Sequence, residues 1–285
     1  MTKSDYLKRI IAEFPEITYK KAVLLDHGWD DVVIILDKKI VFSFPRRPKY
    51  IQEKFKKELL LLPKLGPTLP LSIPQFTFVA RNKSFAGYSY IAGQPLRKKD
   101  LENMPIAKQR HIAQELVGFL QALHAFPVPL ARSHGVINSW TASQHRAWCA
   151  AHLPVIKKRL RASRATQLQN IFDACVHANL REYNCVVHQD FTTDHILFDP
   201  LKNKITGIID FGEVQFSDPA IDIARMWEYG ERFVDFVLHT YKTNDKNIKI
   251  KSREKYIYFC ISLLFFGIKM KRSDYWRRGR AIFSR

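Results

Sequence analysis

Two short segments in the second half of the chain constrain its fold most strongly. The first spans residues 186–198 and reads VVHQDFTTDHILF, and the second spans residues 207–212 and reads GIIDFG. Between them, the apolar residues 196–198 and the β-type residues 204–209 flank the turn-like sequence DPLKN. This pattern predicts a β-hairpin whose two ends return to one edge.

Three polar residues stand at the ends of these runs. Asp190 follows a short β run, His195 precedes the hairpin, and Asp210 ends its second strand. A hairpin with both ends at one edge is expected to bring the three residues together. Phosphoryl transfer needs a carboxylate that orients the attacking hydroxyl and ligands that hold Mg²⁺ against the phosphates. The three residues therefore predict a phosphoryl-transfer site.

The order of these residues is similar to the protein-kinase pattern, in which H-x-D-x-x-x-x-N precedes D-F-G. Together with DPAIDIA at 218–224, it resembles the aminoglycoside phosphotransferase family, whose fold is protein-kinase-like. The wording FTTDHIL at 191–197 is most similar to the 2''-aminoglycoside phosphotransferase branch, where a His takes the place of a metal-binding Asn. The resemblance implies that Asp190 is the catalytic base and that His195 and Asp210 bind Mg²⁺.

Two neighbouring residues are interpreted as structural support. His188 is expected to order the loop by hydrogen bonding and to do no chemistry. The resemblance implies that Asp222 braces the same loop through backbone hydrogen bonds. A lone His-x-Asp or Asp-Phe-Gly is common in ordinary loops and turns, so the inference depends on their joint order.

The composition is that of a globular protein. Hydrophobic residues make up 46% of the 285 residues, an ordinary value for a chain with a real core. The 4 Cys residues have no metal-type spacing and indicate reduced thiols of a cytoplasmic protein. The first residues lack an apolar signal core, and no apolar run reaches roughly 18 residues, so we expect no membrane span.

The formal net charge of +19 leaves a different class of function open. Such charge attracts polyanions, so RNA binding is one interpretation. The sequence has no evident RNA-recognition motif, and the basic clusters at 157–164 and 272–285 have helical spacing, which favours solvated helix faces. The same charge repels a polycationic acceptor, which only a locally acidic pocket would attract.

The residues up to about 92 are predicted to form a small lobe made mainly of an antiparallel sheet. Ser4 is a candidate N-cap for the first helix, and an amphipathic helix follows the third strand. The expected helices are 4–14 and 54–61, and the expected strands are 19–25, 31–36, 40–44, 73–79 and 87–91.

The resemblance assigns nucleotide binding to this lobe. Gly28 lies in a turn similar to the family's nucleotide loop. The segment that contains Ser89, Tyr90 and Ile91 resembles the hinge between lobes, where main-chain groups would hydrogen-bond the purine of ATP or GTP.

The main departure from the family lies at Ser43. The family has a Lys or Arg here, which contacts the nucleotide phosphates and pairs with a Glu on the next helix, present here as Glu58. Arg46 begins on the opposite face of the strand and reaches the phosphates only if the chain turns after Pro45. Asp31 adds negative charge near the expected phosphates. A catalytically weak relative that only binds a nucleotide or small molecule is therefore an alternative, although intact Asp190 and Asp210 count against it.

The remaining residues are predicted to form a mostly helical lobe, with helices at 109–126, within 139–180, at 224–241 and after a polar loop at 243–249. His124 is interpreted as a core residue. In the family, helices in this part of the chain enclose the acceptor site. Glu228, Glu231 and Asp235 are candidate acceptor-binding residues by position, and solvated helix carboxylates are an equal alternative.

We therefore predict an α+β, bilobal, protein-kinase-like fold, with a nucleotide-binding lobe at 1–92 and a catalytic and acceptor-binding lobe at 93–285. The resemblance implies a cytoplasmic, Mg²⁺-dependent phosphotransferase that moves the γ-phosphoryl group of ATP or GTP to an alcohol group, most directly that of an aminoglycoside-type antibiotic. Choline, homoserine or a sugar is an alternative acceptor. We expect a monomer without a membrane or specific nucleic-acid partner. The sequence lacks a P-loop, which argues against a different kinase fold.

Overall fold

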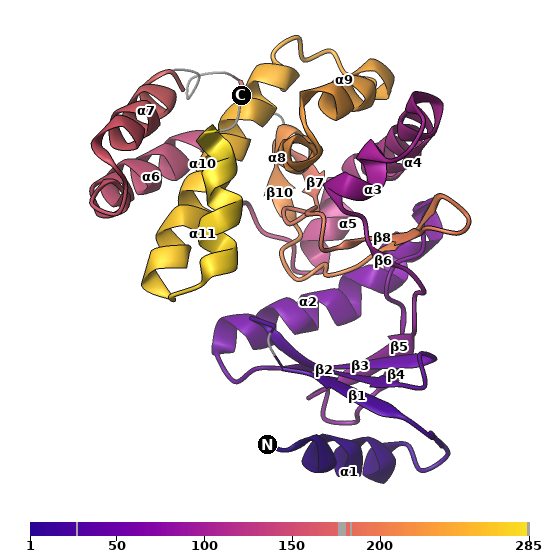
Figure 1. Ribbon diagram of the computed structural model, residues 1–285. Coiled ribbons are helices and arrows are strands. Elements are labelled where there is room, and N and C mark those ends of the chain that lie inside the picture. Colours follow the sequence, from indigo (N-terminus) through magenta and orange to yellow (C-terminus); the bar gives the residue numbers. More distant parts are fainter. Residues whose placement is uncertain (27, 176–180, 183, 284–285) are drawn as a thin grey trace. The chain divides into compact units, whose positions relative to one another are not determined.

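The computed structural model describes residues 1–26, 28–175, 181–182 and 184–283 (Figure 1). It divides into two compact units, and the chain passes between them more than once. Unit 1 comprises Met1–Leu96, Phe126–Val136 and Asp194–Val214, and unit 2 comprises Arg97–Ala125, Ile137–Thr193 and Gln215–Arg285.

Unit 1 contains an antiparallel sheet with the strand order β1-β2-β3-β5-β4. Its strands are β1 (Ala22–Leu25), β2 (Asp31–Leu36), β3 (Ile40–Pro45), β4 (Phe76–Val79) and β5 (Ala86–Ser89). Helices α1 (Lys3–Glu13) and α2 (Lys49–Leu65) cover opposite faces of it (Figure 1). The predicted first and fourth strands begin later than expected, and α2 is longer than expected.

The alternation of side chains along β3 determines what each face of the sheet carries. Phe42 and Phe44 are fully buried with Ile10 of α1 in one hydrophobic core. Successive side chains of a strand point to opposite faces. Ser43 therefore lies on the α2 face, as the alternation in the sequence predicts.

The first helix begins one residue earlier than predicted. Ser4 is not its cap, because Thr2 and Asp5 form a capping box that starts α1 at Lys3. The Thr2 hydroxyl accepts the Asp5 N–H at 3.3 Å, and the Asp5 carboxylate accepts the Thr2 N–H at 2.7 Å. Both bonds satisfy N–H groups that a helix start leaves without partners.

Unit 1 also contains the predicted hairpin. Strands β8 (Ile196–Asp199) and β9 (Lys204–Ile208) pair antiparallel, and β6 (Gln94–Pro95) pairs with β8. Gly207 passes so close to Ser72 that an added Cβ would lie 2.6 Å from the Ser72 carbonyl oxygen. The Ser72 oxygen accepts the Ile208 N–H at 2.9 Å, so the missing side chain at 207 allows this contact. The short helix α5 (Val128–Ser133) and the 3-10 turn at Gly66–Thr68 complete the unit.

Unit 2 is mostly helical and has one two-stranded ladder, β7 (Cys185–Val187) with β10 (Gln215–Ser217). Helix α10 packs against α6, α8 and α11. The helices are α3 (Lys98–Glu102), α4 (Ile106–His124), α6 (Ala142–Lys157), α7 (Ala162–Asp173), α8 (Ala220–Met226), α9 (Glu231–Thr240), α10 (Ile248–Lys269) and α11 (Ser273–Gly279), with 3-10 turns at Trp227–Tyr229 and Arg280–Phe283.

The single helix predicted over 224–241 is wrong. Gly230 has a φ of 104°, which a right-handed helix does not allow, so α8 ends before it and α9 begins after it. The end of the region predicted to be helical, 176–180, lies outside the described residues. No described helix is long and apolar enough to cross a membrane. The α+β class, with an N-terminal antiparallel sheet and a mostly helical remainder, is confirmed.

Candidate active site

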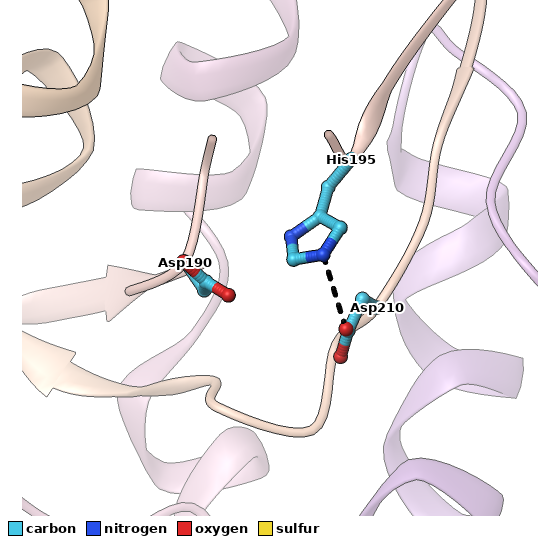
Figure 2. A group of neighbouring side chains, drawn as sticks. All are labelled: Asp190, His195 and Asp210. Atoms are coloured by element: carbon cyan, nitrogen blue, oxygen red, sulfur yellow. Dashed lines mark ion pairs between the residues drawn. The ribbon is translucent and has the colours of Figure 1, made fainter. Parts of the chain in front are cut away.

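The hairpin brings His195 and Asp210 together at one end. His195 precedes β8, Asp210 follows β9, and the Ile209 N–H donates to the His195 carbonyl at 3.0 Å. The His195 Nε2 lies 3.2 Å from the Asp210 Oδ2 (Figure 2). The His195 side chain is 17% exposed and that of Asp210 is 53% exposed, so neither side chain is fully buried.

The backbone at Asp210 is in a conformation that the surrounding structure must hold. Its φ is 68°, in the left-handed region that residues with a side chain rarely adopt. The next residue, Phe211, is fully buried and donates its N–H to Glu58 Oε1 on α2 at 3.1 Å. Glu58 therefore contacts the backbone of the Asp210 segment and is not simply a partner for a strand cation.

Lys57, the neighbour of Glu58 on α2, holds the same segment. Its ammonium donates to the carbonyl oxygens of Gly212 at 2.8 Å and Val214 at 2.7 Å, and the residue is only 8% exposed. One turn earlier, Lys54 pairs with Glu213 and, at 2.8 Å, with Asp30. We did not expect either lysine to have a role. The only indication of such a role in the sequence was that residues 54, 57 and 58 are spaced so that they share one face of a helix.

Four carboxyl groups, those of Asp30, Asp31, Glu58 and Asp210, lie in the region of unit 1 where β2, α2 and the Asp210 segment approach one another. Burial raises the pKa of Asp31 to about 7, and the charges of Asp210 and Asp30 add to the rise. Burial, with Asp31 and Asp210, also raises the pKa of Glu58 well above its usual range. Ser43 supplies only a hydroxyl, which hydrogen-bonds to Asp31. Strand β3 therefore offers these carboxyl groups a hydroxyl and not a cation.

In unit 2, Asp190 (Figure 2) follows β7. Its loop is braced by Asp222. The two carboxylate oxygens of Asp222 accept the N–H groups of His188 and Gln189, each at 2.8 Å. The Asp222 Oδ2 also lies 3.0 Å from His124 Nε2, and His124 Nδ1 lies 2.7 Å from the Tyr241 hydroxyl. Because Asp222 is fully buried, these contacts are strong constraints on the loop.

Arg225, one turn after Asp222 on α8, is a further residue that the sequence interpretation missed. Its Nη2 donates to the Gln189 carbonyl at 3.3 Å, and its guanidinium carbon lies 3.5 Å from the centroid of the Phe259 ring. Burial lowers the pKa of Arg225, while the carboxylate of Asp190 raises it most among the charges. Arg225 is therefore a positive group that interacts electrostatically with Asp190. It lies three residues after Asp222 in the sequence.

Unit 2 also contains a cavity of about 870 Å³. Two of the three candidate acceptor residues, Glu228 and Glu231, line it, whereas Asp235 is not among its lining residues. The lining is formed by Lys98, Ile171, Ala174, Cys175, Trp227, Glu228, Gly230, Glu231, Lys249, Ile250, Arg253, Glu254, Tyr256, Ile257 and Ala281.

Comparison with known proteins agrees with these features. The model of the phosphotransferase enzyme family APH matches residues 21–251. The chain belongs to this family. It is similar to the structure of the GDP and kanamycin complex of APH(2'')-IIIa, with 26% identity, coverage of 97% of this chain and 96% of the other, and a TM-score of 0.85.

Two further solved structures cover this phosphotransferase almost completely. The GDP complex of wild-type aminoglycoside 2'-phosphotransferase-IIIa is 26% identical over 99% of this chain and 97% of the other, with a TM-score of 0.84. A macrolide 2'-phosphotransferase type I shares the fold, with 21% identity over 99% of this chain and 97% of the other, and a TM-score of 0.70. The chain is therefore an APH-family phosphotransferase with a kinase-like fold, and its acceptors are hydroxyl groups of small molecules.

In this phosphotransferase, Arg46 binds the turn that contains Gly28. Its Nε donates to the Gly28 carbonyl at 3.2 Å, and its Nη2 contacts the Asp26 carbonyl at 2.9 Å and the Asp26 carboxylate at 2.7 Å. Arg46 therefore shapes the turn between β1 and β2 through its own contacts.

The segment Ser89–Ile91 continues the sheet for one residue beyond β5. The Tyr90 N–H donates to the Lys39 carbonyl at 2.7 Å, and Ser89 is paired with Ile40. That particular N–H is used within the sheet, so a purine bound at this segment would rely on other main-chain groups.

The buried position of Lys57 makes its contribution to stability depend on pH. Burial lowers the pKa of its ammonium to about 8, although Glu58 and Glu213 act to raise it. An unfolded Lys titrates near 10.4. Between these values the unfolded chain binds this proton more tightly, so the contribution of Lys57 to stability rises with pH over that window. The neutral amine keeps two N–H donors, enough for the carbonyls of Gly212 and Val214.

Replacing Lys57 with Met is expected to lower the free energy of unfolding, because two buried carbonyls lose their donor. The loss should be about 1–2 kcal/mol greater near pH 9.5 than near pH 7.5. Denaturant unfolding at both pH values measures it, with Lys56→Met, an exposed position on the same helix, as the control. An equal loss at both pH values would contradict the placement of Lys57.

Proposed function

We propose that this phosphotransferase moves the γ-phosphoryl group of ATP or GTP to a hydroxyl of an aminoglycoside-type antibiotic, an activity of the antibiotic-resistance type. The observation that carries the proposal is the Asp190 loop, which follows β7 and is braced by Asp222, together with the His195–Asp210 pair at the end of the hairpin. The near full-length likeness to a protein that was solved with GDP and kanamycin supports the acceptor class.

Asp190 is the proposed catalytic base. A carboxylate at this position orients the acceptor hydroxyl and takes its proton as the phosphoryl group is transferred. Asp222 and His188 are positioning residues in this proposal, because Asp222 holds the N–H groups of His188 and Gln189. Asp190 stands only five positions before His195 in the sequence, so chain connectivity favours their joint action.

The donor atoms of His195 and Asp210 fit a magnesium ion. A carboxylate oxygen is the preferred ligand of this cation, and a neutral imidazole nitrogen is a less common one. Both atoms lie at one end of the hairpin and within reach of a single ion. Mg²⁺ would supply positive charge against the nucleotide phosphates.

The nucleotide is proposed to bind residues of the segment 1–92, and catalysis and acceptor binding to belong to the segment 93–285. The residues proposed for the nucleotide are Gly28, Ser43, Arg46, Glu58, Ser89, Tyr90 and Ile91. The acceptor residues proposed are Glu228, Glu231 and Asp235. We further propose that the protein acts in the cytoplasm as a monomer.

A transfer assay tests this function directly. The protein is incubated with Mg²⁺, ATP or GTP and one acceptor from a panel of kanamycin, a macrolide, choline, homoserine and a sugar. Acceptor-dependent release of nucleoside diphosphate, with a phosphorylated product in the mass spectrum, is the expected result for kanamycin. Transfer only to another compound of the panel would change the proposed acceptor class but would leave the proposed phosphoryl-transfer reaction unchanged.

A second candidate function is nucleotide or small-molecule binding without efficient catalysis. The observation that favours it is Ser43, which places a hydroxyl and not a cation beside Asp31, whose carboxyl group interacts with that of Glu58. It predicts a thermal shift with Mg²⁺ and nucleotide but no transfer to any acceptor in the panel. A salt-sensitive interaction with RNA, in the absence of nucleotide binding, would point instead to an RNA-binding protein.

Replacing Ser43 with Lys is expected to tighten nucleotide binding by about ten- to 150-fold. The added ammonium would stand on the α2 face of β3 beside Asp31 and would be available to a phosphate. A charge-assisted hydrogen bond contributes about 1.5–3 kcal/mol, which corresponds to this range. Titration of the protein with ATP and GTP gives the Kd values.

Arg46→Ala distinguishes the competing explanation. If Arg46 already contacts the phosphates, its removal weakens binding and Ser43→Lys brings no gain. The existing contacts of Arg46 with Asp26 and Gly28 favour a role in the turn instead. An unchanged Kd in both variants would argue that the proposed nucleotide site is not used.

A further inference from the structure

Two of the carboxylates that line the unit 2 cavity, Glu228 and Glu231, are already paired with cations of the protein. Glu228 lies 2.9 Å from Arg278 of α11, and Glu231 lies 3.0 Å from Lys249 of α10. Lys249 also contacts Asp235, one turn further along α9, at 2.7 Å. All three acidic residues proposed to bind the acceptor are therefore engaged in ion pairs.

Among the described residues of the cavity lining, the charges are balanced. Its acidic residues are Glu228, Glu231 and Glu254, and its basic residues are Lys98, Lys249 and Arg253. A site that captures a polycation needs an excess of negative charge. Each ammonium group of the acceptor loses its hydration on binding, and only a carboxylate that is not already paired compensates well for this loss. The part of the lining that the structure describes does not offer that excess.

Aromatic and aliphatic side chains form much of the remaining wall. Trp227 and Tyr256 line the cavity beside Ile250 and Ile257. The guanidinium carbon of Arg253 lies 4.7 Å from the Trp227 ring centroid and 5.5 Å from that of Tyr256. A cation of the protein thus already occupies a place where an acceptor ammonium would stack on the rings. The apolar area favours burial of the hydrocarbon surface of an acceptor.

Lys249 is the more exposed of the two cations that pair with the carboxylates of Glu228 and Glu231. It lies in the first turn of α10 and its side chain is 42% exposed, compared with 30% for Arg278. Hydrogen bonds with Asp235 and then Glu231 raise the pKa of its ammonium, so it stays charged at neutral pH. An incoming ammonium group must compete with it for two carboxylates.

We propose that Lys249 is a specificity-determining residue, which occupies Glu231 and Asp235 and thereby selects acceptors with few positive charges. The inference rests on the proposed function for the identity of the cavity as the acceptor site. Exposed ion pairs are individually weak, so Lys249 is expected to adjust the preference among acceptors and not to exclude polycations.

Kanamycin, which carries several amino groups, and a macrolide with a single amino group are suitable probes. Their Kd values are measured by calorimetry for the wild-type protein, Lys249→Gln and Lys249→Arg. Lys249→Gln should bind kanamycin about three- to tenfold more tightly, and the gain should shrink at high salt. The macrolide should change by less than about twofold, and Lys249→Arg should resemble the wild type.

Lys246→Gln is the matched control. It lies in the segment just before α10, is exposed, and removes the same charge from the protein. Its kanamycin Kd should equal that of the wild type, and an equal gain in this variant would show that net charge alone acts. An unchanged or weaker kanamycin Kd in Lys249→Gln, or no kanamycin binding by either protein, would overturn the proposal. If Lys249→Gln gains affinity but no protein transfers phosphate to kanamycin, the proposed function fails and the role of Lys249 in binding stands.

Discussion

Replacing Asp190 with Asn is expected to lower turnover by about 10²- to 10⁴-fold, the usual range for the loss of a general base. An amide of nearly the same shape still contacts the hydroxyl but does not accept its proton. The loop should keep its conformation, because Asp222 accepts the backbone N–H groups of His188 and Gln189. The kcat for kanamycin phosphorylation measures the effect.

Nucleotide affinity should change little in Asp190→Asn, and thermal unfolding should match that of the wild type. Asp199→Asn is the control, because Asp199 contacts Leu201 and Lys202 in the turn after β8, away from the candidate base in the sequence. Wild-type turnover in Asp190→Asn would remove Asp190 from the role of base.

Replacing Asp210 with Ala is expected to abolish Mg²⁺-dependent activity. The change removes the carboxylate at the end of β9, and with it the preferred oxygen ligand of the cation. The positive φ of this residue is no easier for Ala, so the fold is checked by circular dichroism and thermal unfolding. The rate is measured over a range of Mg²⁺ concentrations.

His195→Asn is the companion variant for the metal. An Asn at this position is the commoner residue in kinase-like enzymes and offers an oxygen ligand, so activity should persist. A folded but inactive His195→Asn would assign His195 a different role. Activity of Asp210→Ala at any Mg²⁺ concentration would show that Asp210 is not needed as a ligand of the metal.

Much of the catalytic segment could be predicted from the sequence because its geometry is local. The hairpin follows from two β runs around a turn, and it is enough to bring His195 to 3.2 Å from Asp210. Alternation along β3 likewise predicted that Ser43 lies on the face opposite Phe42 and Phe44, and the structure shows that α2 covers this face. In both cases a repeat of two residues or a short turn decides the direction of a side chain.

The local pattern failed where a single residue changes the backbone. Gly230 interrupts what its neighbours predict as one continuous helix, and the resulting φ of 104° separates α8 from α9. Glu228 and Glu231 therefore belong to different elements, although they were predicted to lie on one helix. Both nevertheless line the same cavity.

The sequence by itself determined which chemical groups this phosphotransferase possesses and the order of Asp190, His195 and Asp210 along the hairpin region. Only the tertiary structure decided how those groups are held and what surrounds them. Lys57 reaches carbonyls 155 and 157 positions away, and Arg278 reaches Glu228 from 50 positions away. Burial, which raises the pKa of Asp31, also arises only when distant elements pack together. A periodic pattern specifies the direction of a side chain relative to its own element, whereas a partner, a dielectric environment and a cavity depend on which elements pack against one another.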